Sequence, residues 1–159
     1  LVRHSEIPVV LVHPEGTPDL TRDASIKHLL IPLDGTPLAE QILEPALTIG
    51  AAMNADYTLL RVVTPVYPMS LPSEPAIFGN VATDIMDRVE KIHADLKREA
   101  MTYLEGVAAR LRAKNFKVEC RVAIEEQPGV AILDSGKPPI DMIAIETHGR
   151  GGFTRMLLG

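Results

Sequence analysis

The sequence predicts a single-domain α/β protein, built on an open, mainly parallel five-stranded sheet with helices on both faces. Short apolar runs alternate with helical patterns in the order strand, helix, strand, helix, strand, helix, strand. Such alternation favours parallel strands, because the right-handed crossover that joins two of them is usually a helix. The 159 residues, 46% of them hydrophobic, are enough to bury one core.

The first half of the chain begins with a strand predicted at residues 26–33, IKHLLIPL, a nearly continuous apolar run typical of a strand buried on both faces. A helix is expected next, since Thr36 can cap it with Pro37 at its first position. The second strand is predicted at 56–63. The proline-rich stretch 64–80 has no usable period and is expected to be a long loop.

The second half of the chain begins with a long amphipathic helix, predicted from about Ala82 to Asn115 because apolar residues recur there at helical spacing. Residues 116–124 alternate as a strand, 128–137 are predicted to form a short helix, and 140–146 form the fourth buried strand.

Composition and charge narrow the classes of partner and compartment. The formal net charge of -5 lacks the basic excess that nucleic-acid binding needs. Cys120 is the only cysteine, so an intramolecular disulfide is excluded and a reducing cytosol fits best. No apolar run approaches the ~20 residues of a membrane helix, and the first residues do not resemble a signal peptide. We expect a cytoplasmic protein without nucleic-acid or membrane partners.

Two loops are candidates for ligand binding. The first, PLDGT at 32–36, follows the first strand, and the second, THGRGG at 147–152, follows the fourth. In open parallel sheets ligands bind outside the carboxyl ends of the strands, where the winding direction reverses. If the first and fourth strands are neighbours, both loops line one crevice. Asp34 can then accept hydrogen bonds from a ribose or an adenine, and the glycine-rich loop can donate backbone N–H groups to phosphates.

Three stretches together resemble the universal stress protein family: IKHLLIPLDGTPLAEQILEPAL, YTLLRVV and IDMIAIETHGRGGFTRMLLG. The resemblance covers about residues 26–159. It implies a five-stranded parallel sheet of Rossmann-like type, pairing of domains through their last strands, and in many members ATP, with Mg²⁺, at the strand ends. It also implies a stress-response regulator or ATP-dependent switch with at most slow ATP hydrolysis.

The family's nucleotide signature is matched in part. It consists of a glycine, two residues, a second glycine, nine residues, and a third glycine followed by Ser or Thr. Here Gly149, nine residues and Gly159 fit, but Glu146 replaces the first glycine, and no residue follows Gly159. Both departures count against tight ATP binding, whereas Arg150 adds a cation to the loop. The resemblance implies that these residues bind the nucleotide: Pro32, Leu33, Asp34, Val62, Ile145, Glu146, His148, Gly149, Arg150, Gly151, Gly152 and Gly159.

Other interpretations stay open. Asp34 before Gly35 is also a common turn residue. His148 has no carboxylate or hydroxyl nucleophile at a fixed spacing, which favours a structural or phosphate-neighbouring role over a catalytic one. The histidines show no metal-ligand spacing. The domain as a whole could be a pairing module that binds no nucleotide. An enzyme of the related adenylyl-transferring families is disfavoured, since their second histidine motif is missing from PLDGTPLAE.

The chain ends suggest a tandem arrangement. Residues 1–14 resemble the final strand of a preceding family copy, 15–25 a linker, and 26–159 a copy without its own last strand. The apolar segment 7–12, IPVVLV, would be an aggregation-prone edge if exposed. We therefore expect it in the fifth-strand position beside 140–146, and a homodimer in which these edge strands meet.

Overall fold

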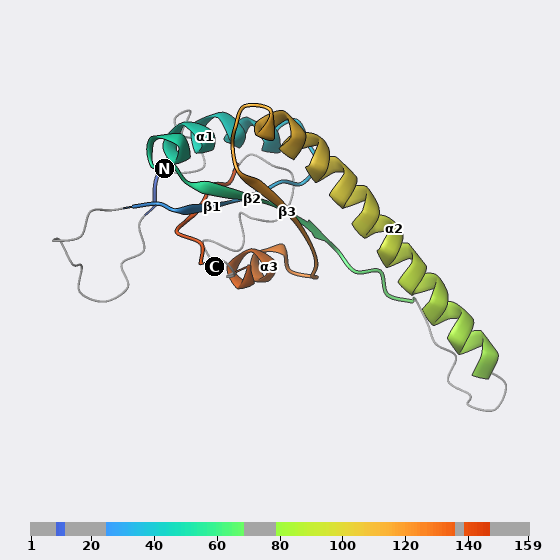
Figure 1. The fold of residues 1–159 in the computed structure, drawn as a ribbon. Helices are drawn as coiled ribbons and strands as arrows, with labels where there is room; N and C mark the ends of the chain where they lie inside the picture. The colour runs from blue at the N-terminus through green and yellow to red at the C-terminus, as the bar shows by residue number, and fades with distance from the viewer. Residues whose placement is uncertain (1–8, 12–24, 69–78, 136–138, 147–159) are drawn as a thin grey trace.

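The computed structural model describes residues 9–11, 25–68, 79–135 and 139–146, and within them it confirms the α/β class (Figure 1). The order of elements alternates strand and helix as predicted. The elements are β1 (His28–Pro32), the short 3-10 helix η2 (Ala39–Ile42), α1 (Leu43–Ala52), β2 (Asp56–Val63), α2 (Gly79–Arg112), β3 (Val118–Ile124), α3 (Pro128–Asp134) and β4 (Met142–Ile143).

The described strands form one parallel sheet with the order β3-β2-β1-β4. In this sheet β1 lies between β2 and β4, with Leu30 opposite Thr58 on one side and Ile143 on the other. The first and fourth strands are therefore neighbours, as the crevice hypothesis requires.

Three strands are shorter than the apolar runs that predicted them. They were expected at 26–33, 116–124 and 140–146, and they span 28–32, 118–124 and 142–143. The physical reason is that burial continues past the regular ladder: Leu33 follows β1 and is 3% exposed. An apolar pattern predicts which residues are buried, but it does not predict at which residue the regular hydrogen bonding of the strand ends.

The first helical segment begins at Ala39, two residues after the Pro37 that the sequence predicts as its first position, and its first turn is a 3-10 helix. The hydroxyl oxygen of Thr36 accepts a hydrogen bond from the backbone N–H of Ala39 (3.2 Å), so Thr36 satisfies an otherwise free donor at the start of the segment. The α-helical hydrogen bonds begin at Leu43.

The helices cover the two faces of the sheet unequally (Figure 1). On one face α1 and the second half of α2 enclose the larger core, whose fully buried residues include Leu29, Ile31, Leu59 and Leu104. On the other face only the seven-residue α3 packs against a smaller cluster centred on Leu30, Leu60 and Ile132.

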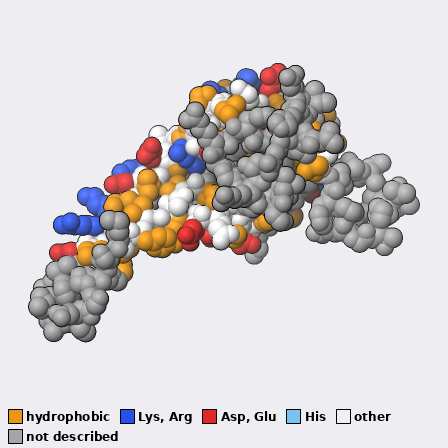
Figure 2. Space-filling view, turned by 180° about the vertical axis from the view of Figure 1, so that it is seen from behind, with side chains coloured by type: hydrophobic (Ala, Val, Ile, Leu, Met, Phe, Trp, Pro, Cys, Tyr) orange, Lys and Arg blue, Asp and Glu red, His pale blue; other side chains and the backbone are white. Residues whose placement is uncertain are grey.

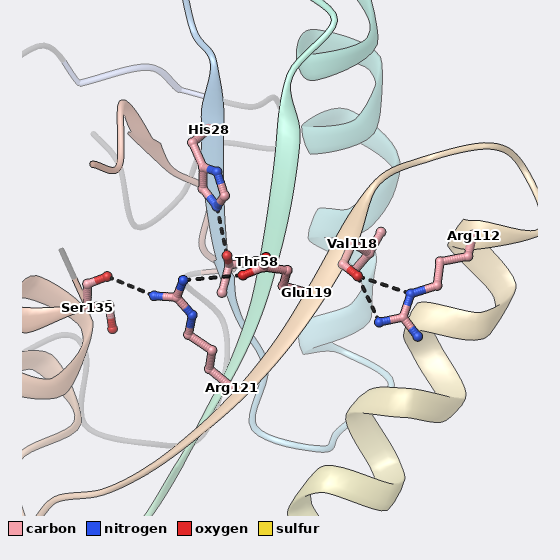
Figure 3. Close-up of polar contacts among 7 residues, drawn as sticks. All are labelled: His28, Thr58, Arg112, Val118, Glu119, Arg121 and Ser135. Atoms are coloured by element: carbon pink, nitrogen blue, oxygen red, sulfur yellow. Dashed lines mark hydrogen bonds and ion pairs between the residues drawn. The ribbon is translucent and has the colours of Figure 1, made fainter. Parts of the chain in front are cut away.

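Polar contacts complete the sheet and its connections (Figure 3). The buried ring of His28 and the hydroxyl of Thr58 form a 2.7 Å hydrogen bond between β1 and β2. Arg121 on β3 donates to the carbonyl of Ser135 and pairs with Glu119, which fixes the end of α3 to the sheet. Arg112 donates twice to the carbonyl of Val118, which closes the turn from α2 into β3. Buried polar groups are tolerated here because they are paired.

The long helix α2 runs well beyond the sheet (Figure 1). Its core contacts are made by residues in its second half, among them Leu104, Val107, Ala108 and Leu111. Its first half projects, and the segment that follows β2 runs beside it. The backbone N–H of Val66 in that segment donates to the Nε2 atom of His93 on α2 (2.8 Å).

The expected fifth strand is only partly covered by the description. Residues 9–11 form no strand, and Val9, Val10 and Leu11 are exposed. The rest of the 7–12 segment lies outside the described residues. The described sheet has four strands, so a fifth strand beside β4, from this chain or a second one, stays a prediction.

Within the described residues, no helix has the length and apolar character needed to cross a bilayer.

Gly50 on α1 tests the packing of the larger core. A Cβ atom at this position would lie 2.3 Å from Oη of Tyr57, whose ring is 1% exposed and packs edge-to-face on Phe116. We expect Gly50→Ala to lower the free energy of unfolding by about 1–3 kcal/mol, because the buried ring cannot yield without repacking. Urea denaturation followed by circular dichroism measures the change.

Gly106→Ala on α2 is the matched control, since a Cβ atom there would meet nothing within 4 Å. It should leave stability unchanged or raise it by up to about 1 kcal/mol, because alanine is the better helix former. Equal effects of the two substitutions would contradict the close approach of α1 to Tyr57.

Candidate functional site

The candidate site lies at the carboxyl ends of β1 and β4, which the sheet order makes the point where the winding direction reverses. From β1 the chain adds β2 and then β3 on one side, and it returns to place β4 on the other side. Beyond the last paired residues, the N–H of Ala144 still donates to the carbonyl of Leu30 (2.9 Å). The loops that follow these two strands therefore start side by side, in the position where open α/β sheets bind ligands.

The β1 loop is held in shape by its own side chains. The Oδ1 atom of Asp34 accepts hydrogen bonds from the backbone N–H of Thr36 (2.9 Å) and from its hydroxyl (2.6 Å). Gly35 between them has a φ of +86°, a conformation that glycine adopts without strain. Asp34 therefore does have the turn role that the sequence left open. Its side chain is exposed, and within the described part of the chain its Oδ2 atom forms no hydrogen bond.

The apolar residues predicted for the site divide between the two faces of the sheet. Leu33 packs into the larger core, so only its backbone faces the loop. Val62 packs against the smaller cluster on the α3 face. By strand alternation Pro32 shares the face of Leu30, which belongs to that same cluster. Pro32 and Val62 thus lie on one face, at the carboxyl ends of adjacent strands.

The β4 side of the site is described only at its start. Ile145 and Glu146 are half-buried and directly follow β4 in the sequence. The remaining predicted site residues lie outside the described residues, namely His148, Gly149, Arg150, Gly151, Gly152 and Gly159. The structure therefore brings together the β1 half of the predicted site and the first two residues of the β4 half.

Arg61 is a residue that the sequence interpretation missed. Its guanidinium group lies beside Gly35, where a Cβ atom would be 2.8 Å from Nη1, and over the ring of Tyr103, 5.2 Å from the ring centre. Tyr103 in turn donates to Glu40 (3.1 Å), and Arg110 pairs with the same carboxylate (2.6 Å). Burial, and next the bond to Glu40, raise the pKa of Tyr103, so this hydroxyl stays protonated at neutral pH.

This cluster ties the β1 loop to α2 through a cation–π contact and two hydrogen bonds to Glu40. One feature of the sequence indicated this cluster. In DYTLLRVV, Arg61 is a lone charge on the same strand face as Tyr57 and Leu59, which belong to the core. A charge at a core-facing position near a strand end indicates a specific partner.

The described site offers a defined set of chemical groups. Asp34 exposes a carboxylate oxygen, Val62 is half-buried, Pro32 is buried, and Arg61 places a cation behind the loop. Among residues 9–11, 25–68, 79–135 and 139–146, no cluster of His, Cys, Asp or Glu side chains is suited to hold a metal ion.

Comparisons with solved structures find similar chains, and one of them, with a TM-score above 0.5, shows the same fold. The hypothetical protein MJ0577, whose structure was used to assign its biochemical function, has a TM-score of 0.62 at 18% identity, covering 86% of this chain and 85% of that one. A universal stress protein family member from Burkholderia pseudomallei has a TM-score of 0.47 at 17% identity, covering 80% of this chain and 86% of its own. A universal stress protein in complex with cAMP has a TM-score of 0.48 at 19% identity, covering 86% of both chains. At these identities the likeness concerns the fold alone.

Comparison with curated proteins gives no match. Comparison with family models gives one over most of the chain, since residues 25–159 match the Universal stress protein family (Usp). This range includes β1, the Asp34 loop, β4 and the glycine-rich segment. The chain belongs to the universal stress protein family.

Proposed function

We propose that the domain binds an adenine nucleotide, ATP with Mg²⁺, at the carboxyl ends of β1 and β4, and acts in the cytoplasm as a stress-response regulator or ATP-dependent switch. The observation that carries the proposal is the adjacency of these two strands at the reversal point of the sheet. Hydrolysis, where it occurs, is slow, since no residue pair in the described site is arranged as nucleophile and base.

The chemistry of the described half supports a base and ribose on this side. The half-buried Val62 supplies apolar contact for an adenine ring, while Pro32, on the same face, is buried. The Oδ2 atom of Asp34 supplies an acceptor for a ribose hydroxyl or the exocyclic amine, while Oδ1 keeps the loop in shape. The phosphates would lie over Gly149–Gly152, where backbone N–H groups and Arg150 suit an anion.

A second candidate function follows from the turn role of Asp34. A carboxylate whose Oδ1 atom already has two partners fits equally a structural loop in an interaction module that binds no nucleotide. Isothermal titration of the whole chain with ATP and Mg²⁺ separates the two. Saturable binding supports the nucleotide site, and absence of heat over a range of temperatures supports the interaction module.

Asp34 provides the first site-specific prediction. Asp34→Ala should weaken ATP binding by about 1–3 kcal/mol, because a hydroxyl of the ligand loses its acceptor. Asp34→Asn keeps an oxygen for the N–H of Thr36 but removes the charge, and it should give an intermediate affinity. Thr36→Val removes the hydroxyl that binds Oδ1 and leaves the carboxylate in place, so it controls for loop shape. If Asp34→Ala and Thr36→Val weaken binding equally, Asp34 acts only through the loop.

Glu146 provides the second prediction. Glu146→Gly should strengthen ATP binding, because it removes a carboxylate close to the phosphates and restores the glycine of the family signature. Glu126→Gly is the matched control, since it removes an equal charge from an exposed position after β3. Titration in low and moderate salt should show the gain shrinking as screening increases. Equal or weaker binding of Glu146→Gly would mean that the glutamate is neutral or useful to the ligand.

The edge strand provides the third prediction. We propose a homodimer through edge strands, in which residues 7–12 occupy the position beside β4. Deletion of residues 1–14 should then yield insoluble or much less stable protein, because an edge strand is left unpaired. Sedimentation velocity and thermal unfolding measure the outcome. A soluble and equally stable monomer after the deletion would rule out both the strand placement and this dimer.

A further inference from the structure

The projecting first half of α2 carries an apolar stripe that neither core uses. Ile85, Val89, Ile92 and Leu96 recur at steps of four, three and four residues, which places them along one side of the helix. None of them belongs to either core cluster of the described residues. Ile92 is 42% exposed and the adjoining Met86 is 51% exposed.

The segment that follows β2 widens this apolar surface. The hydrogen bond from Val66 to His93 holds the segment against the flank of α2 that also carries Met86. Val66 and the neighbouring Tyr67 are both exposed, at 38% and 65%. Hydrophobic side chains show on the surface of this projecting part (Figure 2). Contiguous exposed apolar surface of this kind marks an interaction site.

The charges beside the apolar stripe indicate which partner fits this surface. The flank opposite Met86 and His93 carries Arg88 and, about two turns later, Asp95. If two copies of α2 cross antiparallel with Val89 opposite Ile92 of the second copy, then Ile85 lies opposite Leu96. The same register brings Arg88 of each copy against Asp95 of the other. One pairing of the helices therefore buries the four stripe residues of each copy against those of the other and forms two ion pairs. A parallel pairing in register would instead put Arg88 beside His93 and Asp95 beside Ala100, without a cation for Asp95.

We infer that this surface, formed by residues 85–96 of α2 with Val66 and Tyr67, docks the same surface of a second copy of this chain in antiparallel orientation. Arg98, which pairs with Asp95 within the helix, does not prevent this. The side chains of both are half or more exposed, so the pair is weak and Asp95 can exchange partners. The interface is separate from the sheet edge and from the nucleotide site.

Charge reversal tests the register. Sedimentation equilibrium of the whole chain should show that Arg88→Asp and Asp95→Arg each raise the dissociation constant of the self-association by about tenfold, since each turns two attractions into two repulsions. The double variant should return it to within about threefold of the original. Lys91→Glu, on the outer side of the same helix, is the matched control and should have no effect. Additive losses in the double variant, or no loss in either single variant, would overturn the pairing.

A distance measurement distinguishes this contact from any other dimer. The pairing places its two-fold axis between residues 90 and 91, so spin labels at Lys91→Cys, in a Cys120→Ser background, should lie at the same level of the two paired helices, each on the outer side of its own helix. Directly packed helices have axes about 8–10 Å apart, so one defined label-to-label distance, longer than this separation, is expected. This distance should disappear with Ile92→Glu, while the thermal midpoint, which depends on the core, stays unchanged. A defined distance that survives Ile92→Glu, or its absence without that substitution, would refute the inference.

Discussion

The structure depends on one constraint, which is that β1 is hydrogen-bonded on both sides to parallel neighbours. Leu29, Leu30 and Ile31 have no exposed surface, because the strand is enclosed by β2 and β4 at its edges and by apolar side chains on both faces. Leu29 and Ile31 belong to the larger core and Leu30 to the smaller one, so this strand joins the two. A parallel strand in this position must be apolar throughout, which is why IKHLLIPL has no alternation.

The same constraint places the candidate site. Because β2 and β4 take opposite sides of β1, the chain leaves the carboxyl ends of β1 and β4 at neighbouring positions, which is where open α/β sheets bind ligands. The loop after β1 is then shaped by short-range contacts of Asp34 and Thr36, and its back is supported by Arg61. The unequal faces matter as well, since Val62, which packs against the smaller cluster, stays only half-buried.

The two ends of α2 have different physical roles. Its second half is part of the larger core and reaches the site through Tyr103, which contacts Arg61 and Glu40. Its first half has an apolar stripe with the same helical period, but this half extends beyond the sheet. A single amphipathic helix thus connects the β1 loop to the surface proposed for self-association. A ligand that changed how the loop packs against Arg61 would therefore act on the helix that carries this surface.

The sequence by itself determined the class of fold and the order of its elements, because hydrophobic period depends on local geometry that every chain shares. It also indicated the turn at Asp34, since turn chemistry is visible residue by residue, whereas the glycine-rich loop stays a prediction. Only the tertiary structure decided that β1 and β4 are neighbours and that Arg61 supports the loop from behind. It also decided that Leu33 points into the larger core while Val62 faces the smaller cluster. These facts rest on contacts between segments far apart in the chain, and a local pattern is the same whichever strands become neighbours. The strand ends were overestimated for the same reason, because Leu33 is buried in the larger core although β1 ends at Pro32.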